Sequence, residues 1–172
     1  MNNVTVRAAT EHDAEAIHAL VTAHVAEGRL LPRQLGELRR HANRFVVAES
    51  GGAVRACAEL APLSGLVAEV RSLVVSAPYR HAGLAGRLVA GLRDAAAAWG
   101  FETLSAFTHD ARFFVRQGFS IVPRLWVPEK IATDCHTCPL FLRCEQFAMA
   151  LPLTATARRG AADVPGRRVA VA

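Results

Sequence analysis

Short stretches rich in apolar residues recur along the chain and predict β-strands, and in one of them, residues 66–75, the side chains divide into two distinct faces. The stretches cover residues 4–8, 45–50, 53–60, 66–75, 103–107 and 119–127. Gly51 and Gly52 separate the second stretch from the third. Glycine takes the positive φ that a two-residue turn requires, so we expect these two strands to form a hairpin.

Apolar positions three and four residues apart predict helices between the strands. Thr10 with Asp13 forms an N-cap pattern before a helix that runs to about Val25, and Pro32 is well placed to start a second helix. The predicted helices cover residues 13–25, 33–42, 83–99 and 110–117. Strands and helices mixed in this order predict one domain of the α/β (α+β) class, with a mixed sheet flanked by helices.

The strand at residues 66–75 has two unequal faces. One face holds Leu66, Ala68, Val70, Ser72 and Val74, and the other holds Val67, Glu69, Arg71, Leu73 and Val75. The second face is charged in its first half and apolar in its second half. Glu69 and Arg71 are therefore expected on the same side of the sheet.

The net charge of +5 is concentrated at the C-terminus. Residues 154–172 hold four arginines and one aspartate, while the rest of the chain is close to neutral for its size. We therefore predict a domain over residues 1–153, a disordered basic tail over 154–172, and no nucleic-acid partner. The apolar runs are shorter than the ~18 residues of a membrane span, and the N-terminus lacks a secretory pattern, so we expect a cytoplasmic protein without a membrane partner.

The segment LVVSAPYRHAGLAGRL, residues 73–88, is the strongest candidate for a binding site. A strand ends, two glycines follow an arginine, and a long helix begins. Backbone N–H groups that converge at such a helix start bind phosphate oxygens. The spacing of the two common nucleotide-binding loops is absent, so the ligand class has to come from another feature.

Arg80, Gly83 and Ala85 fit the R-x-x-G-x-A form of the pyrophosphate loop of the GNAT acyltransferases, and FFVRQGF at 113–119 resembles the aromatic helix and "GF" step of that family. The resemblance implies the GNAT fold and acetyl-CoA as cosubstrate. The loop would hold the pyrophosphate, the end of the preceding strand would pair with the pantetheine arm, and the N–H of Val74 or Val75 would stabilise the oxyanion. The implied cofactor-binding residues are Leu73, Val74, Val75, Arg80, His81, Ala82, Gly83, Leu84, Ala85, Gly86 and Phe114.

Direct attack by an amine on the thioester needs a base, and two glutamates are candidates. Glu69 lies on the strand that leads into the loop, and Glu59 lies on the neighbouring strand. The alternative for Glu69 is an ordinary ion pair with Arg71. Many GNAT enzymes carry a tyrosine acid where this chain has Phe114, so we expect no dedicated general acid, with His109 as a weak substitute.

A narrower resemblance is to the short single-domain bacterial N-acetylglutamate synthases, amino-acid N-acetyltransferases of arginine biosynthesis. Residues 30–49, 68–89, 107–119 and 128–144 carry it, in that order. It implies L-glutamate as the acceptor. Arg71, Arg33 and Lys130 are the candidate contacts for its carboxylates, because cationic groups suit an amino-dicarboxylate. An amino-acid substrate is thus the expected partner, and a homodimer is left open.

Two alternatives to this function stay open. The chain could acetylate another small amine or a protein N-terminus, or it could bind acetyl-CoA or a metal without catalysis. The second alternative draws on Cys135, Cys138 and Cys144, whose C-x2-C-x5-C spacing suggests a structural zinc site. Buried reduced thiols are the competing interpretation, because His136 is adjacent to Cys135 and the fourth ligand is missing.

Overall fold

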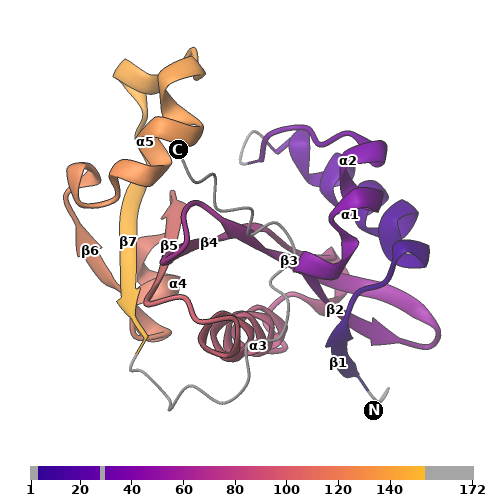
Figure 1. Cartoon of the computed structure of the whole chain (residues 1–172). Coiled ribbons are helices and arrows are strands. Elements are labelled where there is room, and N and C mark those ends of the chain that lie inside the picture. The colour runs from indigo at the N-terminus through magenta and orange to yellow at the C-terminus, as the bar shows by residue number, and fades with distance from the viewer. Residues whose placement is uncertain (1–3, 28–29, 154–172) are drawn as a thin grey trace. The chain divides into compact units, whose positions relative to one another are not determined.

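The computed structural model describes residues 4–27 and 30–153, and these residues form twelve regular helices and strands (Figure 1). The strands are β1 (Thr5–Ala8), β2 (Phe45–Ser50), β3 (Ala53–Pro62), β4 (Val67–Val75), β5 (Thr103–Thr108), β6 (Ser120–Val122) and β7 (Phe147–Pro152). The α-helices are α1 (Ala14–Val25), α2 (Leu35–Arg40), α3 (Leu84–Ala98), α4 (Ala111–Arg116) and α5 (Pro128–Thr133). The strands form one sheet in the order β1-β2-β3-β4-β5-β7-β6, which confirms the predicted α/β class.

The chain divides into two compact units, which are described separately. Unit 1 comprises residues 1–61 and 70–92, and unit 2 comprises residues 62–69 and 93–172. The expected tail over 154–172 lies outside the described residues, so its disorder stays a prediction. In the described part of the chain, no helix is both long and apolar enough to cross a membrane.

Unit 1 is built on antiparallel strands with helices packed against them. β1 pairs with β2, and β2 pairs with β3. The predicted hairpin is confirmed, with φ of 60° at Gly51 and 74° at Gly52. Its core consists of buried apolar side chains from α1, α2 and the strands, namely Ile17, Val21, Leu38, Phe45, Val47, Cys57 and Val74.

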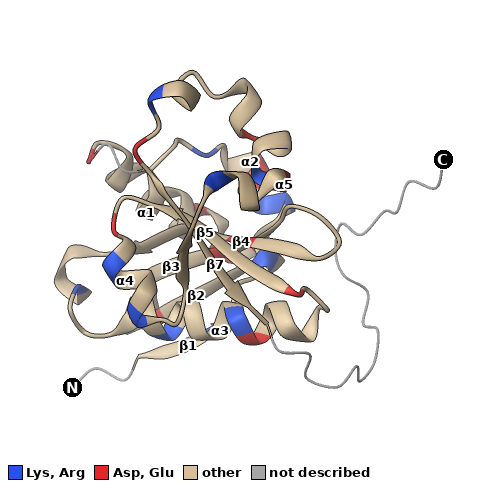
Figure 2. Cartoon of the chain, turned by 90° about the vertical axis from the view of Figure 1, so that its left-hand side faces the viewer, with Lys and Arg blue, Asp and Glu red and all other residues tan. Residues whose placement is uncertain are grey.

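Polar contacts fix a 3-10 turn, Glu11–Asp13, that leads directly into α1 and carries the predicted N-cap pattern. Thr10 and Asp13 form a capping box, in which the Thr10 N–H donates to Asp13 Oδ2 at 2.8 Å. The Arg7 guanidinium of β1 also donates to both oxygens of Asp13, at 2.8 Å, and to Glu49 of β2. This arginine lowers the pKa of the Asp13 carboxyl to about 2. Figure 2 shows basic and acidic positions interspersed along the described elements.

Unit 2 contains the antiparallel strands β5, β7 and β6. β7 pairs with β5 on one side and β6 on the other. β7, the last strand in the described sequence, therefore lies inside the sheet, and β6 is at the edge.

Two predicted elements are shorter than expected. The strand predicted over 119–127 covers only Ser120–Val122, because Pro123 has no N–H to donate to a ladder and a 3-10 turn, Arg124–Trp126, follows it. Helix α2 begins at Leu35, with Gln34 as its N-cap, instead of directly after Pro32.

Candidate active site

The loop that we predict to bind an anion lies in unit 1. After β4 come a 3-10 turn, Ala77–Tyr79, and then an exposed stretch over residues 80–83. φ is 67° at His81 and 74° at Gly83, and α3 begins at the next residue, Leu84. The first helical hydrogen bond joins the Arg87 N–H to the Gly83 carbonyl at 3.2 Å. The N–H groups of the first turn have no intrahelical acceptor, so they suit a phosphate group.

Contacts outside the loop hold its approach in place. The Ser76 N–H donates to the Arg55 carbonyl at 2.9 Å, and the Arg55 guanidinium lies 5.4 Å from the centre of the Tyr79 ring. The Tyr79 hydroxyl lies 3.4 Å from the Ser50 hydroxyl. Tyr79 therefore packs against the residues that precede the loop.

The side chain of Arg80 is engaged on the protein side of the loop. Its Nη2 donates to Glu27 Oε1 at 2.8 Å, and its Nε donates to the Val75 carbonyl at 3.3 Å. The guanidinium thus connects the loop to the end of β4 and to Glu27, which follows α1. Glu27 as the partner of Arg80 could not be predicted from the sequence, because the two residues lie 53 positions apart.

Arg33 and Glu59, predicted as substrate contact and alternative base, contact each other in unit 1. Arg33 Nη1 donates to Glu59 Oε2 at 2.7 Å and to Ser72 Oγ at 3.0 Å, while Nη2 donates to Glu37 Oε1 at 2.8 Å. Burial lowers the pKa of Arg33, but its hydrogen bonds and charge interactions with Glu59 and Glu37 outweigh burial and raise it. Arg33 therefore stays charged and joins α2 to the sheet, and Glu59, 2% exposed, is its buried counter-ion.

The backbone of β4 is irregular at Ser72, where φ is 49°. This conformation interrupts the regular alternation that we predicted across the whole strand, so Arg71 and Leu73 need not share a face. The Cys57 thiol lies 3.6 Å from the Ser72 carbonyl, and burial raises the pKa of that thiol to about 12. Val74 is buried, while Leu73 and Val75 are partly exposed beyond the irregular residue.

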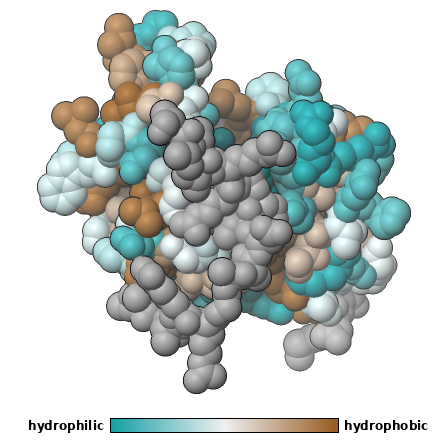
Figure 3. Space-filling view, viewed as in Figure 1, coloured by the Kyte–Doolittle hydropathy of each residue, from teal (hydrophilic) through white to brown (hydrophobic). Residues whose placement is uncertain are grey.

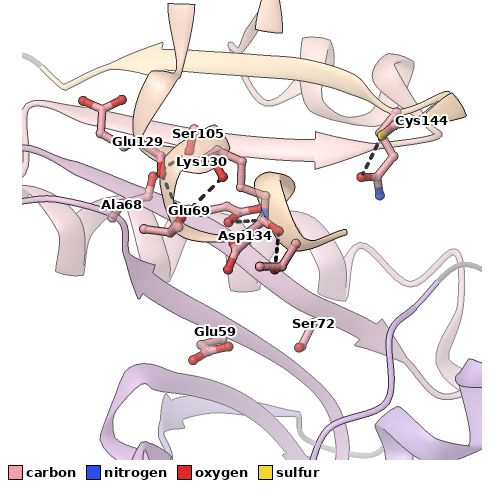
Figure 4. A network of polar contacts seen from close by, with 12 residues as sticks. Glu59, Ala68, Glu69, Ser72, Ser105, Glu129, Lys130, Asp134 and Cys144 are labelled. Carbon is pink, nitrogen blue, oxygen red and sulfur yellow. Dashed lines mark hydrogen bonds and ion pairs between the residues drawn. The ribbon is translucent and has the colours of Figure 1, made fainter. Parts of the chain in front are cut away.

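Glu69 and Lys130 come together in unit 2 (Figure 4). Lys130 Nζ, on α5, lies 2.9 Å from Glu69 Oε2 and 2.9 Å from Asp134 Oδ2. The ammonium also lies 5.4 Å from the centre of the Phe107 ring. The Glu69 and Lys130 side chains are 4% and 14% exposed, so solvent screens this ion pair little.

The strand that carries Glu69 is itself anchored. Ser105 Oγ of β5 donates to the Ala68 carbonyl at 3.0 Å, and both groups are buried. Glu69 is therefore held on a rigid part of unit 2. The alternative partner from the sequence, Arg71, is partly exposed and follows Glu69 by two residues in β4.

Phe114, predicted beside the cofactor, is a buried packing residue of unit 2. Its ring packs edge-to-face against Phe113 and Phe119, with centroids 5.1 Å and 5.2 Å apart. His109 precedes α4 in an exposed turn. Position 114 therefore supplies no hydroxyl group to act as a general acid.

The cysteine segment does not provide a metal site. Among residues 4–27 and 30–153, no three His, Cys, Asp or Glu side chains are arranged to hold a metal ion. Burial raises the pKa of the Cys135 thiol, which favours the protonated form. The zinc hypothesis for Cys135, Cys138 and Cys144 therefore lacks a ligand set in the structure.

The sequence of this chain is similar to those of known acetyltransferases. The family model described as "Acetyltransferase (GNAT) family" matches residues 9–119. An uncharacterized N-acetyltransferase of Chlorobaculum tepidum is 31% identical over 144 residues, which cover 84% of this chain and 93% of that protein. An amino-acid acetyltransferase of Pseudomonas syringae pv. syringae is 34% identical over 124 residues, which cover 70% of this chain and 29% of that protein.

A solved structure shares the fold over most of the described chain. It is N-acetylglutamate synthase from Neisseria gonorrhoeae, complexed with coenzyme A and N-acetyl-glutamate, with a TM-score of 0.79 and 25% identity. The match covers 90% of this chain and 36% of that one. This chain therefore spans only about a third of the length of that synthase.

Proposed function

The chain belongs to the GNAT acetyltransferase family, and on that basis we propose that it transfers the acetyl group of acetyl-CoA to the α-amine of an amino acid, L-glutamate. The ion pair between Lys130 and Glu69 carries the proposal. It places a cation suited to a substrate carboxylate 2.9 Å from a carboxylate suited to accept a proton from an amine.

The loop over residues 80–86 supports acetyl-CoA as donor. Its exposed backbone and the positive φ at His81 and Gly83 suit the pyrophosphate, which the N-terminus of α3 attracts. Leu73 and Val75, at the end of β4, are partly exposed, and in the proposal the pantetheine arm pairs with the backbone of this stretch. The N–H of Val74 or Val75 is the donor for the oxyanion of the tetrahedral intermediate.

In the proposed reaction, the neutral amine attacks the thioester carbonyl and the C–S bond breaks. The amine proton passes to Glu69, directly or through one water, and coenzyme A leaves as the thiolate. A thiol has a pKa of about 8.5, so the thiolate leaves at neutral pH without a strong acid. This agrees with phenylalanine at position 114.

Glu69 is a better base than Glu59. Glu59 is enclosed by the sheet and bonded to Arg33, an arginine that stays charged. A lysine such as Lys130 can move away from Glu69 on its flexible side chain when a substrate carboxylate competes for it. We therefore assign proton transfer to Glu69 and acceptor binding to Lys130 and Arg71. Arg33 and Glu59 have the structural role of joining α2 to the sheet.

The acceptor is supported by relatives. The protein from P. syringae is named an amino-acid acetyltransferase, and the N. gonorrhoeae enzyme binds N-acetyl-glutamate together with coenzyme A. Both proteins are much longer than this chain, and the C. tepidum relative that matches it in length is uncharacterized. A direct assay of acceptors is therefore the decisive test.

The test measures thiol release from acetyl-CoA with glutamate, glutamine, aspartate, ornithine, a polyamine and a peptide N-terminus, and identifies the product by mass. We expect glutamate to have the highest kcat/KM. Preference for the polyamine or the peptide would refute the acceptor assignment. Binding of acetyl-CoA without turnover of any acceptor would point to a non-catalytic module.

Glu69→Gln tests the base. General bases contribute about 100-fold or more, so we expect kcat to fall by at least that factor and the rise of rate with pH to flatten. Glu102→Gln is the matched control, because Glu102 is an exposed carboxylate of the same unit. An unchanged pH profile in Glu69→Gln would remove this residue from the mechanism.

A further inference from the structure

Exposed apolar side chains gather in one region of unit 2. Among the described residues, nine large apolar side chains are exposed, and seven of them lie between residues 115 and 147. Figure 3 shows apolar surface over the part of unit 2 that holds α5 and the residues after it, at the upper left. Six of these side chains define what we call the apolar patch: Ile121, Leu125, Trp126, Leu140, Leu142 and Phe147.

The turns that carry the patch are tied together by one arginine. The Arg124 guanidinium donates to the carbonyls of Phe141 and Gln146 at 3.5 Å, and also to that of Cys144. These bonds hold the turn with Leu125 and Trp126 against the segment with Leu140 and Leu142.

The sheet edge contributes the remaining two side chains. Ile121 of β6 is in register with Met149 of β7, and Phe147 lies two residues before Met149. Side chains in register across an antiparallel pair, and side chains two apart on one strand, point to the same face. Ile121 and Phe147 therefore share a sheet face, and the patch extends from the turns to this edge.

The size of the patch is unusual for a surface that faces water. Leu142 is 93% exposed, Leu125 79% and Trp126 72%. With ordinary side-chain areas, the six residues expose on the order of 800 Å² of surface, above the few hundred Å² typical of the largest patch on a monomer. About 800 Å² is also what one partner contributes to a stable interface of standard size.

We infer that a second copy of this chain covers the apolar patch, in a two-fold symmetric dimer. Among the described strands, β6 is the last of the sheet, so the same strand of another copy can pair with its outer side. Exposed charges of both signs, Arg143 and Glu145, flank the patch. A surface with one cation beside one anion complements its own copy across a two-fold axis.

A membrane surface fits this arrangement less well. Peripheral binding to anionic lipid needs an excess of Lys and Arg around the apolar residues. Arg143 here is balanced by Glu145, and Arg124 is occupied with backbone carbonyls.

The test is the molar mass of the full chain by sedimentation velocity and light scattering. We expect a dimer at concentrations of about 10 μM, with a dissociation constant in the micromolar range or below. Leu125→Glu and, separately, Leu142→Glu should weaken dimerisation about 100-fold or more, because each dimer then buries two unpaired carboxylates. Leu31→Glu is the matched control, since Leu31 is 72% exposed in unit 1.

Circular dichroism and thermal melting should show that these variants fold, because the replaced side chains contact solvent already. A wild-type chain that stays monomeric at about 100 μM would overturn the inference, since an interface of this size would be populated there. So would a dimer that survives both patch variants, or one that Leu31→Glu disrupts equally. Sedimentation of a monomer with anionic vesicles would also overturn it, in favour of a membrane.

Discussion

Replacement of Glu59 by glutamine should cost far more stability than the same replacement of Glu37, although both carboxylates bind Arg33. Glu59→Gln removes the charge of a side chain that is 2% exposed and lies 2.7 Å from Arg33 Nη1. Breaking a buried ion pair on one side costs about 3–5 kcal/mol. Glutamine can still accept one hydrogen bond and Glu37 remains, so we expect the lower end, about 3 kcal/mol.

Glu37→Gln is the matched control for this perturbation. Glu37 Oε1 lies 2.8 Å from Arg33 Nη2, but the Glu37 side chain is 37% exposed. Water can replace much of what the carboxylate provides, so we expect a loss of at most about 1 kcal/mol. The comparison holds the arginine and the chemical change constant and varies only burial.

The assay is urea unfolding followed by circular dichroism and tryptophan fluorescence, with coincident transitions as the test of a single cooperative step. A second change, Arg33→Met in the Glu59→Gln background, should recover part of the lost stability, because it removes the uncompensated charge. Equal losses in the two glutamine variants would refute the argument from burial. We also expect an undiminished kcat per folded Glu59→Gln molecule, since Glu59 is the counter-ion of Arg33 and proton transfer is assigned to Glu69.

Three further predictions concern the loop, the acceptor site and pH. Gly83→Ala should raise KM for acetyl-CoA about tenfold in steady-state assays, because φ of 74° strains a residue with a Cβ even though the space around it is open. Lys130→Met should raise KM for the acceptor at least tenfold and leave KM for acetyl-CoA unchanged, with Asp134→Asn having a smaller effect of the same kind. Because the folded-state pKa of Asp13 is about 2, against 3.8 unperturbed, about 2 kcal/mol of stability is present above about pH 4 and lost as pH falls towards 2. Unfolding free energies measured across that range should fall accordingly, and Arg7→Met should flatten the fall.

The local elements of the fold could be predicted because each is encoded in adjacent residues. Short apolar stretches located the strands, and Gly51 with Gly52 located the hairpin, which needs only two residues of positive φ. The position of β7 between β5 and β6 could not be predicted in this way. Pairing of strands that are not consecutive depends on packing across the chain, and no local pattern records it.

The same distinction applies to the candidate site. The loop over residues 80–86 is contiguous, so its geometry follows from its own glycines and the helix after it. Arg33 instead contacts Glu59 and Ser72, which lie 26 and 39 residues further along the chain, and its role became visible only in the structure. Asp134 is different, because it is the C-cap of α5 and follows Lys130 by four residues, a spacing that favours an ion pair.

The cysteine segment shows how a motif can serve a site without supplying its chemistry. Its thiols form no described metal site, yet its backbone carbonyls accept the hydrogen bonds of Arg124, and Asp134 at its start holds Lys130. The segment therefore holds the turn at Arg124 through main-chain contacts and Lys130 of α5 through an ion pair, while its leucines form part of the apolar patch. On this argument, the spacing of the cysteines reflects tight turns that bring carbonyls to Arg124, and replacing the thiols by groups of similar size should matter less than removing that arginine.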